Sequence, residues 1–173
     1  MSRFLCAAVT GLALTAASGT AHAAVGFTAH QTWDYGTHGF YGSPFSLPTL
    51  DYMSDGLLVQ GHVLELLAGA SNSTLDLGVN VYKTMQKKKV TEDINGIFQG
   101  GAKLNVASGP DFDIGGGSLA LIASARLGAQ AAKGVGFGMY VVPDLGVAKT
   151  GDEIELVVGG GVQISAWLKK VDG

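Results

Sequence analysis

The chain is poor in cysteine, in charge and in long apolar segments, and each shortage excludes a class of protein. Its one cysteine, Cys6, lies near the start of the 173 residues, so the remainder holds no disulfide bond and depends on burial or on a membrane for stability. After the N-terminus, no apolar run reaches the ~18 residues that a membrane-spanning helix needs. The formal net charge of −3 does not fit a nucleic-acid-binding surface, and we expect no nucleic-acid partner.

The first residues resemble a cleaved secretory signal. Arg3 supplies a positive charge, residues 4–17 form an apolar segment, and Ala21-His22-Ala23 matches an A-x-A cleavage site. A lipoprotein signal would need a cysteine directly after the apolar segment, whereas Cys6 lies near its beginning. We therefore predict a signal peptide at residues 1–23, a single domain at residues 24–173, and export from the cytoplasm.

Three consecutive segments near the C-terminus alternate large apolar residues with small or polar ones at a period of two. They cover residues 118–130, 134–147 and 153–168, and turn-sized breaks separate them. Side chains point to opposite faces of a strand, so each segment predicts a long strand with one apolar face. Consecutive hairpins of this kind indicate an antiparallel up-and-down β-barrel.

The rest of the chain supplies five more predicted strands, which bring the total to eight. They lie at residues 25–35, 45–53, 57–67, 74–84 and 94–107, with loops at 36–44, 68–73, 85–93 and 108–117. Pro48 weakens the strand at 45–53 because proline cannot donate a hydrogen bond to a neighbouring strand. An even number of strands of ~9–11 residues matches a bacterial barrel that spans a bilayer.

The scarcity of charge decides which face of the strands points outward. Charged residues make up 14% of the chain, against ~25% in a typical soluble domain. The non-apolar face carries mainly glycine, serine, alanine, asparagine and glutamine, which suit a crowded barrel interior. We therefore expect the apolar face to contact lipid and predict a transmembrane barrel. The alternative is a soluble, calycin-like periplasmic or secreted barrel that binds a small apolar ligand.

Over residues 24–168 the chain resembles the small eight-stranded outer-membrane β-barrels of Gram-negative bacteria. That class includes the membrane domain of outer-membrane protein A, its X-type relatives and the lipid A palmitoyltransferase. The resemblance is one of architecture and rests on no short motif. It implies an outer-membrane location, contact with outer-membrane lipid, and the barrel-assembly machinery as a partner; no other protein partner is indicated. The chain departs from the class because Leu168 and residues 169–173 follow Trp167, where members usually end on an aromatic residue.

A barrel with its N-terminus in the periplasm predicts a polar network in the lumen. The residues expected near its outer end are Lys103, Asp144, Glu153 and Glu155. Those expected near its periplasmic end are Arg126 and Gln130, close to Asn95, Gln163 and Trp167. Buried charges need partners, and an eight-stranded lumen has room for little more than side chains. We therefore expect a plugged, non-conducting interior.

Chemistry is suggested by His30 and His62 on the lumen faces, with Asp34 on the face of His30. A histidine near an acid is typical of acyl-transfer or hydrolase sites, as in the lipid A-modifying barrels. The serine such a site requires cannot be chosen, because Ser46, Ser54 and Ser73 all fall in turns or loops. The simpler interpretation is a pair of hydrogen-bonded lumen histidines, and we predict no cofactor and no metal.

Two further features do not fit simple alternation. Glu65 falls on the lipid face of the strand at 57–67, where a carboxylate would be costly, so we expect it at the lipid headgroups or turned inward by a bulge. Lys87, Lys88 and Lys89 predict a solvated loop.

The leading hypothesis is an outer-membrane barrel with a structural or interaction role and no catalysis. The alternatives are a lipid-modifying outer-membrane enzyme and the soluble, ligand-binding barrel.

Overall fold

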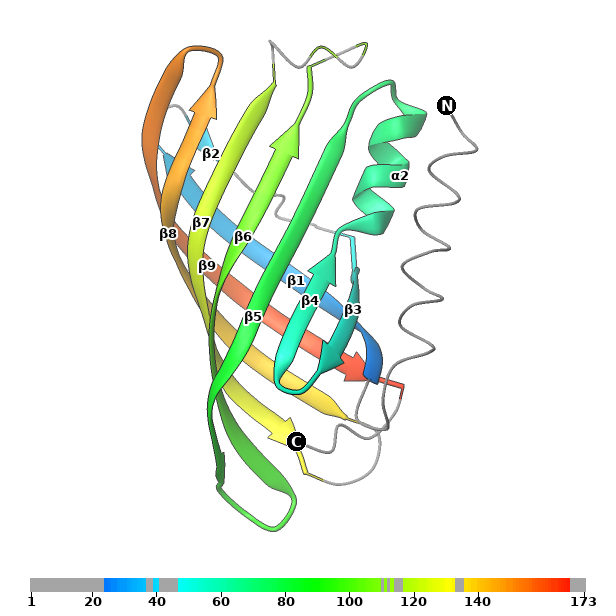
Figure 1. Ribbon diagram of the computed structural model, residues 1–173, viewed down its shortest axis with the longest axis vertical. Helices are drawn as coiled ribbons and strands as arrows, with labels where there is room; N and C mark the ends of the chain where they lie inside the picture. Colours follow the sequence, from blue (N-terminus) through cyan, green and yellow to red (C-terminus); the bar gives the residue numbers. More distant parts are fainter. Residues whose placement is uncertain are drawn as a thin grey trace.

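The computed structural model describes residues 24–36, 39–40, 47–109, 111, 113, 117–132 and 136–168, without the side chains of Asp34, Gly39 and Phe40. The predicted signal peptide, residues 1–23, lies outside the described residues. The described chain folds into one antiparallel sheet and one helix (Figure 1). Its elements are β1 (Ala24–Gly36), β2 (Gly39–Phe40), β3 (Thr49–Ser54), β4 (Leu57–Gly61), α2 (Val63–Ser71), β5 (Asp76–Lys89), β6 (Ile94–Ala107), β7 (Ser118–Ala131), β8 (Phe137–Thr150) and β9 (Glu153–Trp167).

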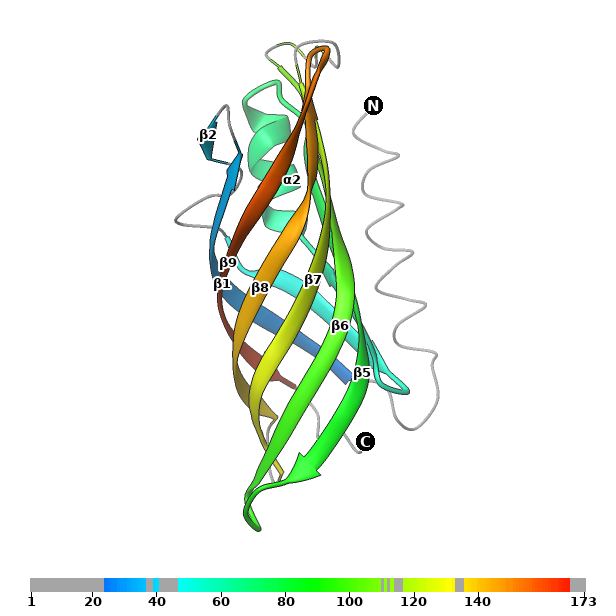
Figure 2. The same ribbon diagram turned by 90° about the vertical axis from the view of Figure 1, so that its left-hand side faces the viewer.

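The sheet closes on itself. Its strands follow the order β2-β1-β3-β4-β5-β6-β7-β8-β9, and β1 also pairs with β9, from Gly26 with Trp167 to Tyr35 with Val158. The short strand β2 pairs with the end of β1, so the other eight strands form the ring. The strands are inclined to the long axis of the ring (Figure 2), as closure of a barrel requires. The predicted all-β, antiparallel, eight-stranded ring is confirmed.

Five predicted strands match the structure closely. The segment 94–107 is β6, and the three alternating C-terminal segments become β7, β8 and β9. The segment 25–35 forms β1 with one more residue at each end. These strands have an unbroken period-two pattern, and tight turns such as residues 151–152 join them. Regular alternation therefore located both the strands and their faces.

The strand predicted at residues 45–53 is partly wrong. Leu47 and Pro48 lie outside any strand, and β3 begins directly after them at Thr49. Residues 45 and 46 lie outside the described residues. Because proline has no N–H to donate, pairing begins only beyond Pro48. The short β3 still pairs with β1 and β4, which preserves the even count.

The strand predicted at residues 57–67 is wrong in its second half. Strand β4 ends at Gly61, and residues 63–71 form the helix α2. The helical segment is rich in leucine, alanine and glutamate, which favour helix, and has one β-branched residue, Val63. The loop predicted at 68–73 is accordingly helical as far as Ser71. Among the described residues, no helix has the length and apolarity needed to cross a membrane.

The loop predicted at residues 85–93 is wrong over residues 85–89, whereas residues 90–93 lie outside any strand. Strand β5 continues to Lys89 and pairs with β6 as far as Asn95, after a register shift beside Met85. The three lysines therefore lie on an extended hairpin at the lower end of Figure 1, and all three are exposed. The lysines are exposed to solvent as predicted, but their backbone groups pair with β6 and do not form a loop.

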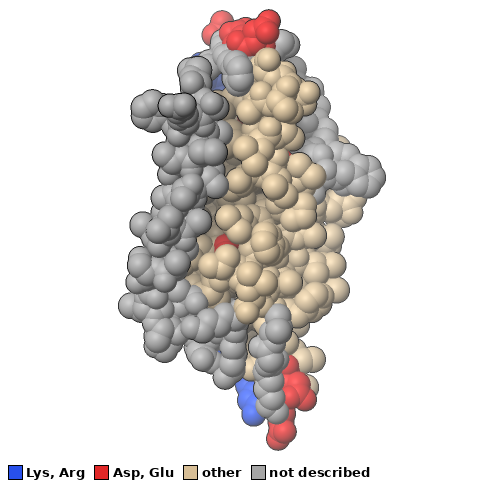
Figure 3. All heavy atoms as spheres, turned by 90° about the vertical axis from the view of Figure 1, so that its right-hand side faces the viewer, with Lys and Arg blue, Asp and Glu red and all other residues tan. Residues whose placement is uncertain are grey.

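The two faces of the ring differ sharply in polarity. The interior buries many polar side chains, including Arg126, Gln60 and Gln163. The outer face exposes large apolar side chains, as at Leu121, Val141 and Ile164. In Figure 3 the middle of the described surface is almost free of charge, and charged residues gather at its two ends. This arrangement is the reverse of a soluble domain, which buries its apolar side chains.

The wall is complete at one end and interrupted at the other. β1 pairs with β3 only from Ala24 to Thr28, and β4 pairs with β5 only from Leu57 to Gly61. Above these short strands, α2 packs against β5 (Figure 1). The upper part of the ring is therefore made by six long strands and a helix in place of eight strands.

Candidate functional site

The lower half of the interior is organised around Arg126 on β7. Its Nε donates to Gln163 Oε1 at 2.7 Å, its Nη1 to Gln99 Oε1 at 2.5 Å, and its Nη2 to Ser165 Oγ at 2.8 Å. Its guanidinium carbon lies 3.7 Å from the centre of the Tyr140 ring. The fully buried cation is thus held by three hydrogen bonds and an aromatic face, which compensate the loss of water.

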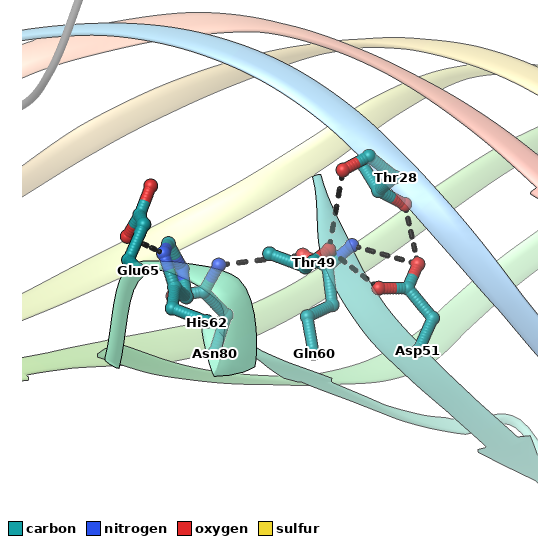
Figure 4. Close-up of polar contacts among 7 residues, drawn as sticks. All are labelled: Thr28, Thr49, Asp51, Gln60, His62, Glu65 and Asn80. Carbon is teal, nitrogen blue, oxygen red and sulfur yellow. Dashed lines mark hydrogen bonds and ion pairs between the residues drawn. The ribbon is translucent and has the colours of Figure 1, made fainter. Parts of the chain in front are cut away.

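A buried acid, Asp51 on β3, lies across the interior from Arg126. It accepts hydrogen bonds from Thr28, from Thr49 Oγ1 at 2.6 Å and from Gln60 Nε2 at 3.1 Å (Figure 4). Thr28 also bonds Ser165 at 2.6 Å, so the network is continuous with that of Arg126. Sequence analysis did not single out Asp51, because the strand predicted at residues 45–53 was irregular at Pro48 and its faces were not assigned.

The other predicted lumen residues separate into buried and exposed positions. Lys103 forms a buried ion pair with Asp144, and Glu155 is also buried. Glu153 is exposed, because it is the first residue of β9 and lies beside the β8–β9 turn. Gln130 is buried and lies 3.5 Å from the Tyr140 hydroxyl, whereas Asn95 is half-buried near the lower hairpin.

Large side chains fill the space between these polar groups. Trp167, Tyr82 and Tyr140 are each at most 1% exposed, and Tyr82 shares a hydrogen bond of 3.0 Å with Ser124. An eight-stranded interior is just wide enough for side chains to fill. The lower half of the interior is therefore filled by polar, aromatic and other apolar side chains.

The second group of interest lies higher, where the wall is interrupted. His30 comes from β1, His62 follows β4, and Glu65 lies in the first turn of α2. The His30 and His62 rings meet edge to face with centroids 4.9 Å apart. His62 Nδ1 lies 2.6 Å from Glu65 Oε2. Each of the three side chains offers one metal-ligating atom, and these atoms all lie within 4.8 Å of one another.

This cluster is shielded from water without being sealed. The side chains of His62 and Glu65 are 9% and 17% exposed. The contact between His62 Nδ1 and Glu65 Oε2 holds the imidazole in one orientation.

The place of His62 depends on a glycine of the adjacent strand. A Cβ on Gly78 would lie 2.6 Å from His62 Cγ, so the imidazole packs directly on the backbone of β5. The backbone N–H of His62 also donates to Gly78 O at 2.9 Å. His62 is the N-cap residue of α2 but makes no side-chain capping bond, which leaves its ring available for other contacts.

The structure brings together part of the predicted constellation. His30 and His62 are neighbours, whereas the side chain of Asp34 and residue Ser46 lie outside the described residues. Ser54 lies at the β3–β4 turn, at the opposite end of the ring from α2 (Figure 1), and Ser73 lies in the turn after α2. The acid beside the histidines is Glu65. A strand places residues 62 and 65 on opposite faces, whereas a helical turn places them together.

No protein-family model, curated protein or solved structure matches the chain.

Proposed function

We propose that the protein is an integral outer-membrane β-barrel with a structural or interaction role and a plugged lumen. The observation that carries the proposal is the inverted polarity of the ring. The exposed face presents large apolar side chains on every long strand, and the buried face holds Arg126, Asp51 and Lys103. Lipid would cover the apolar face, and ring closure leaves no unpaired edge where all eight strands pair.

Aromatic residues support the same conclusion. Trp33 and Tyr35 are exposed near the upper end of β1, and Phe27 and Phe137 near the lower ends of β1 and β8. Aromatic side chains at both ends of an apolar band are typical of transmembrane barrels. A soluble ligand-binding barrel would instead need an apolar interior, and the polar network around Arg126 occupies that space.

Membrane fractionation combined with gel mobility tests the proposal. We expect recovery in the outer membrane, and a shift in mobility between unheated and boiled samples, because closed barrels resist detergent unless heated. In planar bilayers, purified protein should give no stable open-channel currents. Recovery in the soluble fraction would overturn the membrane assignment, and porin-sized currents would overturn the plugged lumen.

A second candidate function, ester hydrolysis on a membrane lipid, is favoured by one observation. The His62–Glu65 pair lies in the upper part of the ring, where the short strands β3 and β4 have ended and α2 takes their place. A histidine oriented by a carboxylate can take a proton from a water molecule that attacks an acyl ester. Lipid mass profiles of cells with wild-type protein, His62→Gln and the control Glu92→Gln test it. Loss of a deacylated species in His62→Gln alone supports hydrolysis, and identical profiles exclude it.

A further inference from the structure

The upper cluster has the composition of a transition-metal site assembled from separate parts of the fold. Two imidazoles and one carboxylate come from β1, the β4–α2 junction and α2. Imidazole suits zinc and neighbouring divalent metals, whereas calcium and magnesium prefer oxygen ligands. We propose that the imidazoles of His30 and His62 bind one divalent transition-metal ion of the zinc type, and that Glu65 orients His62 for this role.

The spacing of the three side chains suits such an ion. Zinc binds imidazole nitrogen at ~2.0–2.1 Å, so two imidazole ligands of one ion lie at most about 4.2 Å apart. The candidate atoms of His30, His62 and Glu65 lie within 4.8 Å of one another, which is close to that separation.

His62 supplies an independent reason to expect a ligand. Its side chain is 9% exposed, and its Nε2 is buried with no hydrogen-bond partner among the described residues. Buried polar atoms of native proteins normally have partners. A metal ion at Nε2 would provide one, whereas the pairing of Nδ1 with Glu65 leaves Nε2 unused.

The contact between Glu65 and His62 also matches a known feature of metal sites. Histidine ligands commonly donate their second ring N–H to a carboxylate, which fixes the tautomer and the orientation of the ring. With Nδ1–H donated to Glu65 Oε2 at 2.6 Å, Nε2 carries the lone pair that binds metal. Glu65 thus positions His62 and adds a negative charge beside the ion.

The site is compatible with entry and exchange of the ion. Glu65 retains some exposure, and the cluster lies at the interrupted part of the wall, above the packed network of Arg126. The two imidazoles leave coordination positions open for water or for an oxygen of a substrate. Metal binding depends only on the cluster and stands whether or not the barrel lies in a membrane.

Isothermal titration of the untagged full chain with Zn²⁺, after treatment with a chelator, tests the proposal. We expect one Zn²⁺ per chain and no comparable binding of Ca²⁺. His30→Gln and His62→Gln should abolish binding, and Glu65→Gln should weaken it at least tenfold, as for other residues that support a ligand. Glu92→Gln, the same chemical change at an exposed carboxylate, should bind like wild type.

A second variant keeps the test decisive if a histidine substitution fails to fold. Gly78→Ala removes no ligand but forces His62 aside, so it should also weaken Zn²⁺ binding. Co²⁺ should give the visible absorption of imidazole coordination in wild type and in Glu92→Gln, and not in Gly78→Ala. The proposal is overturned if wild type binds no Zn²⁺, if Ca²⁺ binds equally well, or if binding persists in His62→Gln, Glu65→Gln and Gly78→Ala.

Discussion

The two halves of the ring differ in how regularly they are built. From β5 to β9 the wall consists of five strands of 14 or 15 residues, each paired along nearly its whole length. The N-terminal half has the short strands β3 and β4, with six and five residues, and ends in α2. The histidine–glutamate cluster belongs to this irregular half apart from its contact with Gly78.

This difference indicates where a small barrel has room for a binding or catalytic site. A closed wall of alternating strands fills its interior with side chains, as around Arg126, and leaves little room for a ligand. Where two strands stop early, a helix can present side chains at an angle that the wall does not provide. The regular half therefore contributes Arg126 to the packed interior, and the irregular half contributes the candidate site.

The largest expected effect lies in the regular half, at Arg126. Arg126→Leu leaves the oxygens of Gln99 and Gln163 without their buried donor, and each buried acceptor that loses its partner costs ~1–3 kcal/mol. Urea unfolding followed by tryptophan fluorescence measures the loss. Arg126→Lys, which keeps the charge, should lose less. Equal stability of wild type and Arg126→Leu would show that the network does not support the ring.

A smaller effect is expected on the outer face, and it depends on depth. Val141 is 61% exposed near the middle of β8, and Val141→Arg should cost ~2–4 kcal/mol if that position meets the bilayer midplane. Leu168→Arg, beyond the end of β9, should cost ~0–1 kcal/mol at an interface. Unfolding from lipid vesicles measures both. Two small and equal costs would indicate that water, not lipid, surrounds the ring.

Matched glycine substitutions separate the two halves directly. A Cβ on Gly128 would lie 2.0 Å from Met139 O, which is backbone, whereas one on Gly78 would meet the side chain of His62. Overpacking typically costs ~1–3 kcal/mol, and we expect Gly128→Ala to lie at the upper end of that range and Gly78→Ala at the lower end. Thermal unfolding provides the comparison. A reversed order would show that the irregular half is the more rigid one.

The contrast between the halves also explains what the sequence could predict. Alternation located β6 to β9 and placed Arg126, Asp144 and Gln163 on the buried face, because a period of two is a local property of the chain. It failed at residues 63–71, where leucine, alanine and glutamate serve a helix as well as a short apolar strand. With a strand assumed there, Glu65 pointed to lipid, and its pairing with His62 could not be anticipated.

The partners of lumen residues were the other part that the sequence could not supply. Alternation shows that His30 points inward but not which residue lies opposite, since that depends on register and on how strands distant in the chain meet. The contact of His30 with His62 arises because β4 ends at Gly61, so that His62 follows it in the upper part of the ring. The spacing of residues in the sequence did not predict how short β3 and β4 are.

The smallest expected effect lies at the extended hairpin, in the regular half but beyond the ring. Lys88 and Lys89 are exposed on the last residues of β5, and substitutions at such sites usually change stability by no more than ~0.5 kcal/mol. The double variant Lys88→Gln, Lys89→Gln should therefore unfold at the same urea concentration as wild type. If the hairpin lies against anionic headgroups, each lysine would contribute about 1 kcal/mol to membrane attraction near the surface. Urea unfolding from neutral and from anionic vesicles separates the two cases. Equal unfolding midpoints of wild type and the double variant in both lipids agree with a solvated hairpin. A lower midpoint of the variant in anionic vesicles alone would contradict it.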